Sequence, residues 1–235
     1  MKYYFTGATY YDTETLCRGL ESDYKHIIDS FIIAAKREIG ESFWFEFQGS
    51  FFQDNIFQGN NYLFDFEQSS PLKTTYKGLG GDRIAKLTGA LTKFPGHNIM
   101  LMDFGTATTL NLATKDYKFM GGFVHLGVQA SIEAIPLKLE GFPDYTDSDA
   151  YQSLIAGINL KEIFLEESAA KAVIEGAYRE HLAMIQYYKS YALEKFNGEQ
   201  FITIATGGNA ALFSAEFNKC VDSRELLEAF CFTMV

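Results

Sequence analysis

The sequence predicts an α/β fold, and three observations support this prediction. Short apolar and aromatic runs typical of strands alternate with longer segments whose apolar residues have helical spacing. Hydrophobic residues make up 47% of the 235 residues, enough for a substantial core. Only 4 prolines occur, and no obvious linker interrupts the pattern. Alternation of this kind favours two similar lobes, each with strands and helices, over a single sheet.

The first half of the chain begins with a strand or hairpin over residues 3–11 that bends at Thr6-Gly7. A helix is predicted over residues 23–39, because apolar residues recur there at helical spacing as far as Gly40. Two further strands and a helix are predicted at residues 43–47, 62–66 and 82–91.

The second half repeats this theme. A helical region covers residues 147–195, with breaks expected at Gly157 and Gly176 because glycine weakens a helix. A turn at Thr206-Gly207-Gly208 precedes a shorter helix over residues 209–217. The strands of this half are predicted at residues 99–103, 108–113, 118–124 and 201–205.

Charge and hydropathy exclude some classes of partner. The formal net charge is -10, and no basic stripe is present, so nucleic acid is not expected to be the main partner. No apolar run approaches the length of roughly 20 residues that a membrane span needs. The opening residues also lack the plan of a signal peptide. We therefore expect a cytoplasmic protein without a membrane partner, in which any anionic ligand is bound by a local site.

The segment 98–109 carries the clearest chemical signal. An apolar run leads into Asp103, Gly105 and three threonines, Thr106, Thr108 and Thr109, which predicts a strand that opens into a phosphate-facing turn. Glycine lets backbone N–H groups approach phosphate oxygens, threonines add hydroxyl donors, and a carboxylate can hold a cation. Asp, Gly and Thr are also ordinary turn residues, so a plain turn stays an alternative.

Three other glycine-centred segments follow the same architecture. In Gly80-Gly81-Asp82-Arg83, the acid and the arginine come at the start of a predicted helix, where an anion would be attracted, although Asp82 could simply cap that helix. The segment 121–127 could line a ligand or provide a bend in a strand. The Thr206-Gly207-Gly208 turn lies between a strand and a helix, as adenosine-binding turns often do.

Taken in order, these segments resemble the type III pantothenate kinases of the actin-like and sugar-kinase-like ATPase superfamily. The matching motifs are G-x-D-R at residues 80–83, D-x-G-T-A-T-T at 103–109, G-G-x-I-x-P-G at 121–127 and T-G-G at 206–208. The resemblance implies an α/β fold of two ribonuclease-H-like lobes with a cleft between them. These would be an apparently shortened lobe over residues 1–97 and a second lobe over 98–235.

The resemblance also implies a function. A homodimer would transfer the γ-phosphate of ATP to pantothenate and give 4'-phosphopantothenate, the first step of coenzyme A biosynthesis, with Mg²⁺ and a monovalent cation (K⁺ or NH₄⁺). Asp82 would be the catalytic base, within a substrate site of Gly80, Gly81, Asp82 and Arg83. Asp103 would bind the metal. The ATP contacts would come from Thr106, Thr108, Thr109, Gly207 and Gly208.

The sequence departs from the family pattern at several positions. The printed chain contains no D-x-G-N-T phosphate motif, Asn111 stands where the family has an acid, and Leu126 replaces a proline. The T-x-x-A segment near residues 146–150 is displaced by one residue, which leaves open which threonine contacts the substrate. The strand near Lys2-Tyr3-Tyr4-Phe5 is accordingly interpreted as the second family strand, with the first one absent.

Two functional hypotheses follow from these departures. In the first, the protein is a divergent pantothenate kinase, in which Asp12 supplies the missing metal ligand or the true start lies upstream of Met1. In the second, it is a catalytically weakened homologue that binds nucleotide or a pantothenate-like ligand as a regulatory subunit. The intact Asp82-Arg83 pair favours the first hypothesis, because a buried unpaired charge would be costly to keep for packing alone.

Overall fold

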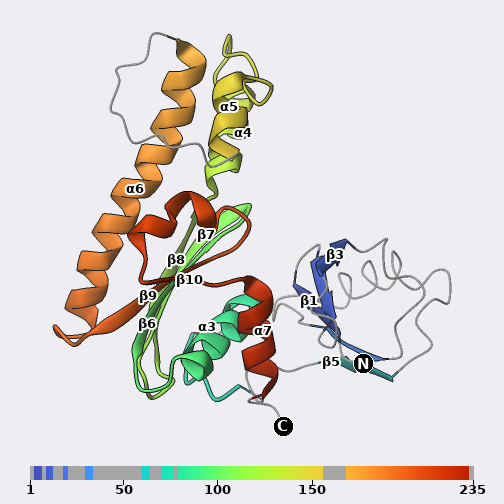
Figure 1. Ribbon diagram of the computed structural model, residues 1–235, viewed down its shortest axis with the longest axis vertical. Helices are drawn as coiled ribbons and strands as arrows, with labels where there is room; N and C mark the ends of the chain where they lie inside the picture. Colours follow the sequence, from blue (N-terminus) through green and yellow to red (C-terminus); the bar gives the residue numbers. More distant parts are fainter. Residues whose placement is uncertain are drawn as a thin grey trace. The chain divides into compact units, whose positions relative to one another are not determined.

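A computed structural model describes part of the chain in two compact units (Figure 1). The described residues are 3–6, 9–12, 18–20, 30–33, 60–63, 70–76, 79–155 and 168–232. Unit 1 draws on Met1–Gly96, Lys115–Phe119 and Ser223–Val235, and unit 2 on His97–Thr114 and Met120–Asp222.

The sheet of unit 1 has five strands in the order β3-β2-β1-β4-β5. The central strand β1 pairs antiparallel with β2 and parallel with β4, β2 pairs antiparallel with β3, and β4 pairs parallel with β5. The strands are β1 (Tyr3–Thr6), β2 (Thr9–Asp12), β3 (Arg18–Leu20), β4 (Ser30–Ile33) and β5 (Asn60–Leu63).

The sheet of unit 2 has the order β10-β9-β6-β7-β8. Its central strand β6 pairs antiparallel with β7 and parallel with β9, and β9 pairs parallel with β10. The strands are β6 (Asn98–Phe104), β7 (Ala107–Ala113), β8 (Phe119–Leu126), β9 (Phe201–Thr206) and β10 (Lys219–Cys220).

The two sheets share one topology, although the sequence contains no repeat that would predict it. In each, the first strand is central, the second and third continue on one side, and the fourth and fifth add parallel strands on the other. The chain is therefore built from two α/β units of the same strand plan, and the predicted α/β class is confirmed. The exact lobe boundary at residues 97/98, and the cleft between the lobes, stay predictions.

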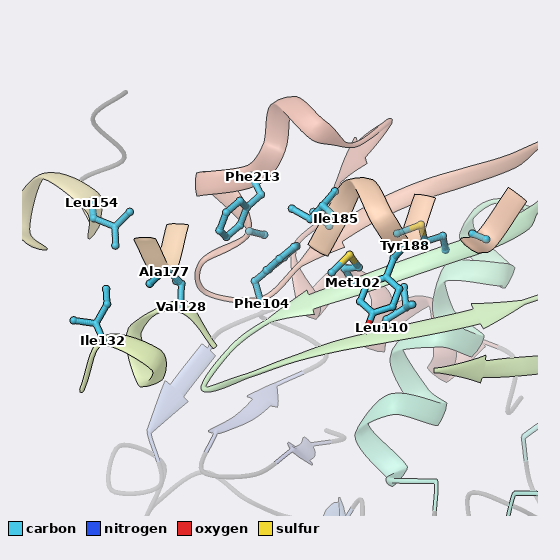
Figure 2. Packing of buried hydrophobic residues seen from close by; sticks show 14 of the residues in the cluster. Met102, Phe104, Leu110, Val128, Ile132, Leu154, Ala177, Ile185, Tyr188 and Phe213 are labelled. Carbon is cyan, nitrogen blue, oxygen red and sulfur yellow. The ribbon is translucent and has the colours of Figure 1, made fainter. Parts of the chain in front are cut away.

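The helical segments of unit 2 share one core with its sheet. This core contains buried side chains from β6, β7 and all four helical segments, among them Met102, Val128, Leu154 and Ile185 (Figure 2). The helical segments are α4 (Val128–Lys138), α5 (Asp149–Ile155), α6 (Ala169–Lys195) and the 3₁₀ helix η2 (Ala210–Glu216). In unit 1, α3 (Gly81–Lys93) and α7 (Ser223–Phe232) pack side by side.

Most predicted elements are confirmed, but some are wrong. Ser30–Ile33 is strand β4 and not part of a helix, because the continuous apolar run Phe31-Ile32-Ile33 suits a strand with a neighbour on each side. Gly176 does not break a helix and lies inside α6. Helix α4 was not predicted from the sequence. The strand prediction for residues 43–47 lies outside the described residues.

The helices of the described ranges include none with the length and apolar character needed to cross a bilayer.

Candidate functional site

The Asp82-Arg83 pair begins helix α3 in unit 1. Gly80 is the N-cap residue, and its carbonyl oxygen accepts hydrogen bonds from the backbone N–H groups of Arg83 and Ile84, both at 3.0 Å. No side chain caps this helix, so Asp82 is not a capping residue. A Cβ atom on Gly80 would lie 2.6 Å from Oδ1 of Asp82, which shows that the glycine makes room for the carboxylate.

Electrostatics at this helix start favour an anion-binding arginine. Arg83 is half-buried, and this burial lowers the pKa of its guanidinium, while Asp82 and Tyr76 act in the opposite direction. The N-terminal end of the helix dipole adds partial positive charge at the same end. The arrangement therefore combines a carboxylate, which can accept a proton, with a cationic fork suited to a ligand carboxylate.

Asp103 lies near the end of the central strand of unit 2, between two threonines. It pairs with Thr109 on β7 and with Thr206 on β9, so the three side chains stand on the same face of the sheet. Asn111 adds its amide on this face and donates a hydrogen bond to Oγ1 of Thr109 at 3.2 Å. The result is a row of oxygen-bearing side chains around one carboxylate.

The turn after Asp103 is held by two other loops. The Gly105 N–H donates to the Ala107 carbonyl oxygen at 3.1 Å, and the Gly127 N–H donates to the Thr106 carbonyl oxygen at 2.8 Å. On the other side, the Asn209 N–H donates to the Phe104 carbonyl oxygen at 2.9 Å. Three glycine-centred segments that are far apart in sequence therefore meet at this turn.

Close backbone approach explains why two of these positions are glycines. A Cβ atom on Gly127 would overlap the carbonyl oxygen of Gly105 and lie 2.7 Å from that of Thr106. A Cβ atom on Gly207 would overlap Oδ1 of Asp103, and the residue has a φ of 95° that L side chains rarely adopt. The loops pack so tightly that larger residues would displace the turn.

The three predicted phosphate-binding threonines have different surroundings. Thr106 is exposed at the turn, and Thr109 is half-buried beside Asp103. Thr108 pairs with Phe104 and so lies on the opposite face, fully buried, with no hydrogen-bond partner for its hydroxyl among the described residues. The phosphate role of all three stays a prediction, but Thr106 and Thr109 have the better geometry for it.

The interpretation of the first strand needs correction. Strand β1 is the central strand of its sheet, so it has the position that β6 has in unit 2. Tyr3–Thr6 therefore has the place of the first strand in this plan, and not that of a second strand. The β1–β2 hairpin closes at the Thr6–Thr9 pair, whereas Asp12 pairs with Tyr3 at the other end. At about 3.3 Å per residue, Asp12 lies roughly 10 Å along the strand from the hairpin turn, which disfavours it as a substitute ligand there.

Sequence reasoning missed one element of this site. Helix α4 starts directly after Gly127, and its first-turn N–H groups therefore lie next to the Thr106 turn. Gln129 in this first turn accepts a hydrogen bond from the Asn209 side chain at 3.4 Å. The glycine followed by Val128 and a run of helix-forming residues was the available signal.

The structure thus defines an α/β protein of duplicated sheet plan, with a turn bearing an acid and threonines at the end of a central strand. The sequence profile of the type III pantothenate kinases matches residues 64–189. The chain belongs to the type III pantothenate kinase family.

Curated relatives agree with this assignment. Type III pantothenate kinase 1 of Francisella tularensis is 33% identical over 138 residues, which are 59% of this chain and 49% of that protein. The type III pantothenate kinase of Legionella pneumophila is 30% identical over 138 residues, 59% of this chain and 50% of that protein. The chain therefore spans about half the length of these curated relatives.

A crystal structure from Campylobacter jejuni, described as a Baf family transcriptional activator, shares the fold. It superposes with a TM-score of 0.61 at 14% identity and covers 99% of this chain and 96% of its own.

Proposed function

We propose that this protein phosphorylates pantothenate with ATP to give 4'-phosphopantothenate, the first step of coenzyme A biosynthesis. Family membership supports the reaction class. At the level of residues, the proposal rests on the surroundings of the Asp103 carboxylate. Thr109 and Thr206 pair with Asp103 on the neighbouring strands, and Gly207 approaches it closely. A cytoplasmic location is part of the proposal.

In the proposed reaction, Asp82 accepts the proton of the pantothenate primary hydroxyl. The hydroxyl oxygen forms a bond to the γ-phosphorus of ATP, the bond to the bridging oxygen breaks, and ADP leaves with that electron pair. Arg83 would hold the pantothenate carboxylate, and Thr106, Thr109 and Gly207-Gly208 would position the nucleotide.

The donor set around Asp103 fits the expected cations. Mg²⁺ and K⁺ prefer oxygen ligands, and Asp103 and Thr109 offer a carboxylate and a hydroxyl on one face. The described residues contain no group of three or more His, Cys, Asp or Glu suited to a metal. Mg²⁺ typically uses one or two carboxylates together with substrate phosphates, so one acid suffices. When bound, such a cation neutralises charge on the triphosphate.

The proposed homodimer would use the edge of the second sheet. Strand β8 is an edge strand, and on it Phe123, Val124 and Leu126 are 37%, 59% and 58% exposed. Tyr187 on α6 is 65% exposed. Apolar side chains at an edge strand favour association with another surface. Light scattering after size exclusion should give a dimer, and Val124→Lys should shift the mass toward the monomer.

A coupled kinase assay with pantothenate, Mg²⁺ and K⁺, run beside calorimetric ATP binding, tests the proposed reaction. ATP- and pantothenate-dependent ADP release supports it. ATP binding without turnover would overturn the kinase proposal and favour a regulatory homologue.

A further inference from the structure

We infer that His181, which no motif singled out, is a positioning residue that holds the Thr106 turn in its nucleotide-binding shape. This inference rests on the proposed function, because it assumes that the turn binds ATP. His181 lies on helix α6 and is 3% exposed. It does not belong to any of the four glycine-centred segments.

One peptide group connects His181 to the turn. Nε2 of His181 lies 3.2 Å from the carbonyl oxygen of Leu126. The N–H of the same peptide belongs to Gly127 and donates to the Thr106 carbonyl oxygen at 2.8 Å. A hydrogen bond at one end of a peptide polarises the group and strengthens the bond at its other end. With its proton on Nε2, His181 donates to the Leu126 carbonyl oxygen, and it then both orients this peptide and strengthens its hold on Thr106.

The imidazole is itself fixed from two sides. Nδ1 lies 2.8 Å from the carbonyl oxygen of Ala177, one helical turn earlier. A neutral ring has one N–H and donates to one of the two carbonyls, whereas the imidazolium donates to both. Every form that carries a proton on Nε2 makes the bond to Leu126.

A second path through aromatic rings reaches the same turn. The His181 ring stacks on Phe213 with centroids 5.7 Å apart, and Phe213 stacks on Phe104 at 4.8 Å. Phe104 directly precedes Gly105 in the turn, and Figure 2 shows it facing Phe213. Hydrogen bonding and packing from one side chain therefore converge on residues 104–106.

The variants His181→Phe and His181→Gln separate positioning from packing. Phenylalanine keeps an aromatic ring but has no donor, whereas glutamine keeps a donor for the Leu126 carbonyl. We expect His181→Phe to weaken ATP binding by roughly tenfold, the value of one well-placed hydrogen bond, with the KM for pantothenate unchanged. His181→Gln should recover most of the ATP affinity. His181 also lines a cavity of about 540 Å³, so imidazole should enter and restore ATP binding to His181→Ala.

Tyr188→Phe is the matched control. It removes the 2.7 Å hydrogen bond between the tyrosine hydroxyl and Nε2 of His125, which also joins α6 to β8 but bypasses the Leu126–Gly127 peptide. Calorimetry and thermal unfolding should be measured for all four variants. Two results would overturn the inference about His181 without affecting the proposed function. One is an equal loss of ATP affinity in Tyr188→Phe and His181→Phe, and the other is an unchanged ATP affinity in His181→Phe. A parent protein that binds ATP without phosphorylating pantothenate would refute the proposed function but leave this comparison valid, and one that binds no ATP would refute both.

Discussion

Asp103 and Gly207 are in such close contact that the carboxylate of one occupies the space where a side chain of the other would begin. The contact joins the end of the central strand β6 to the turn that follows its parallel neighbour β9. The glycine thereby fixes the carboxylate on the face that also carries Thr109. This relationship leads to the first prediction.

Gly207→Ala should destabilise the protein and weaken ATP binding together. The new Cβ would overlap Oδ1 of Asp103, and alanine is strained at a φ of 95°. We expect a loss of about 1–3 kcal/mol in the free energy of unfolding. Urea denaturation and ATP calorimetry are the measurements. Gly208→Ala is the control for the stability measurement, because a Cβ there has no atom within 4 Å. Equal urea midpoints for the two variants would contradict this account.

Thr108→Val should stabilise the protein and leave ATP binding unchanged. The Thr108 hydroxyl is buried on the Phe104 face, and it has no partner among the described residues. Replacing it with a methyl group removes an unsatisfied polar group, which is worth about 1 kcal/mol or more. The unfolding free energy and the ATP dissociation constant can be measured on the same sample. Thr109→Val is the comparison, and should weaken ATP binding. A weakened affinity in Thr108→Val would instead restore Thr108 as a phosphate contact.

The difference between Thr108 and Thr109 shows how far the sequence alone can lead. Alternation along a strand places neighbouring side chains on opposite faces, so the sequence implies that only one of them can stand beside Asp103. Which one depends on the register across the turn, and the structure supplies that register by pairing Asp103 with Thr109 and Phe104 with Thr108. The turn itself was predictable because its acid, glycine and threonines are contiguous.

The supporting contacts could not be predicted, because they join segments far apart in the chain. Gly127 packs on Gly105, and Gly207 packs on Asp103, because the loops that carry these residues meet in the folded structure. Strand β4 was mistaken for a helix because a short apolar run fits both periodicities. The two sheets have the same strand order, and a strand order can be shared without any repeat in the sequence.

The carboxyl group of Asp144 should titrate below the ordinary value of 3.8. The backbone N–H of Thr146 donates to its Oδ1 at 2.9 Å and the Thr146 hydroxyl at 2.8 Å, and both bonds favour the charged form. A lowered folded-state pKa means that this contribution to stability is present above pH 3.8 and is lost as the pH falls through the folded-state value.

An NMR titration of the Asp144 carboxyl carbon measures this shift. Thr146→Ala should raise the pKa only part of the way back, because the backbone N–H, the larger cause, remains. Thr146→Ser keeps the hydroxyl and should titrate like the parent. An unshifted pKa in the parent protein would show that the turn at residues 144–146 is not formed in solution. The same variants should be assayed for the KM of pantothenate, because this segment is the one expected to supply a substrate-contacting threonine.

Asp82→Asn should abolish pantothenate phosphorylation while the fold and the ATP affinity persist. Loss of a general base lowers kcat by about 10²–10⁴-fold. Asp82 caps no backbone N–H of α3, so the structural loss comes from its interaction with the helix dipole, about 0.3–1 kcal/mol, and from its charge interaction with Arg83. Asp116→Asn, at an exposed position in the turn after β7, is the charge-matched control and should be fully active.

Steady-state kinetics, thermal unfolding and ATP calorimetry together decide the role of Asp82. A base that contacts only pantothenate predicts a lower kcat with an unchanged ATP dissociation constant. A parallel loss of ATP affinity would instead assign Asp82 to the nucleotide. Retained turnover in Asp82→Asn would show that another group accepts the proton.

Arg83→Lys tests whether the arginine holds the substrate, because a single ammonium cannot reproduce the two parallel hydrogen bonds of a guanidinium to a carboxylate. It should raise the KM for pantothenate more than it lowers kcat, which separates holding the substrate from activating its hydroxyl.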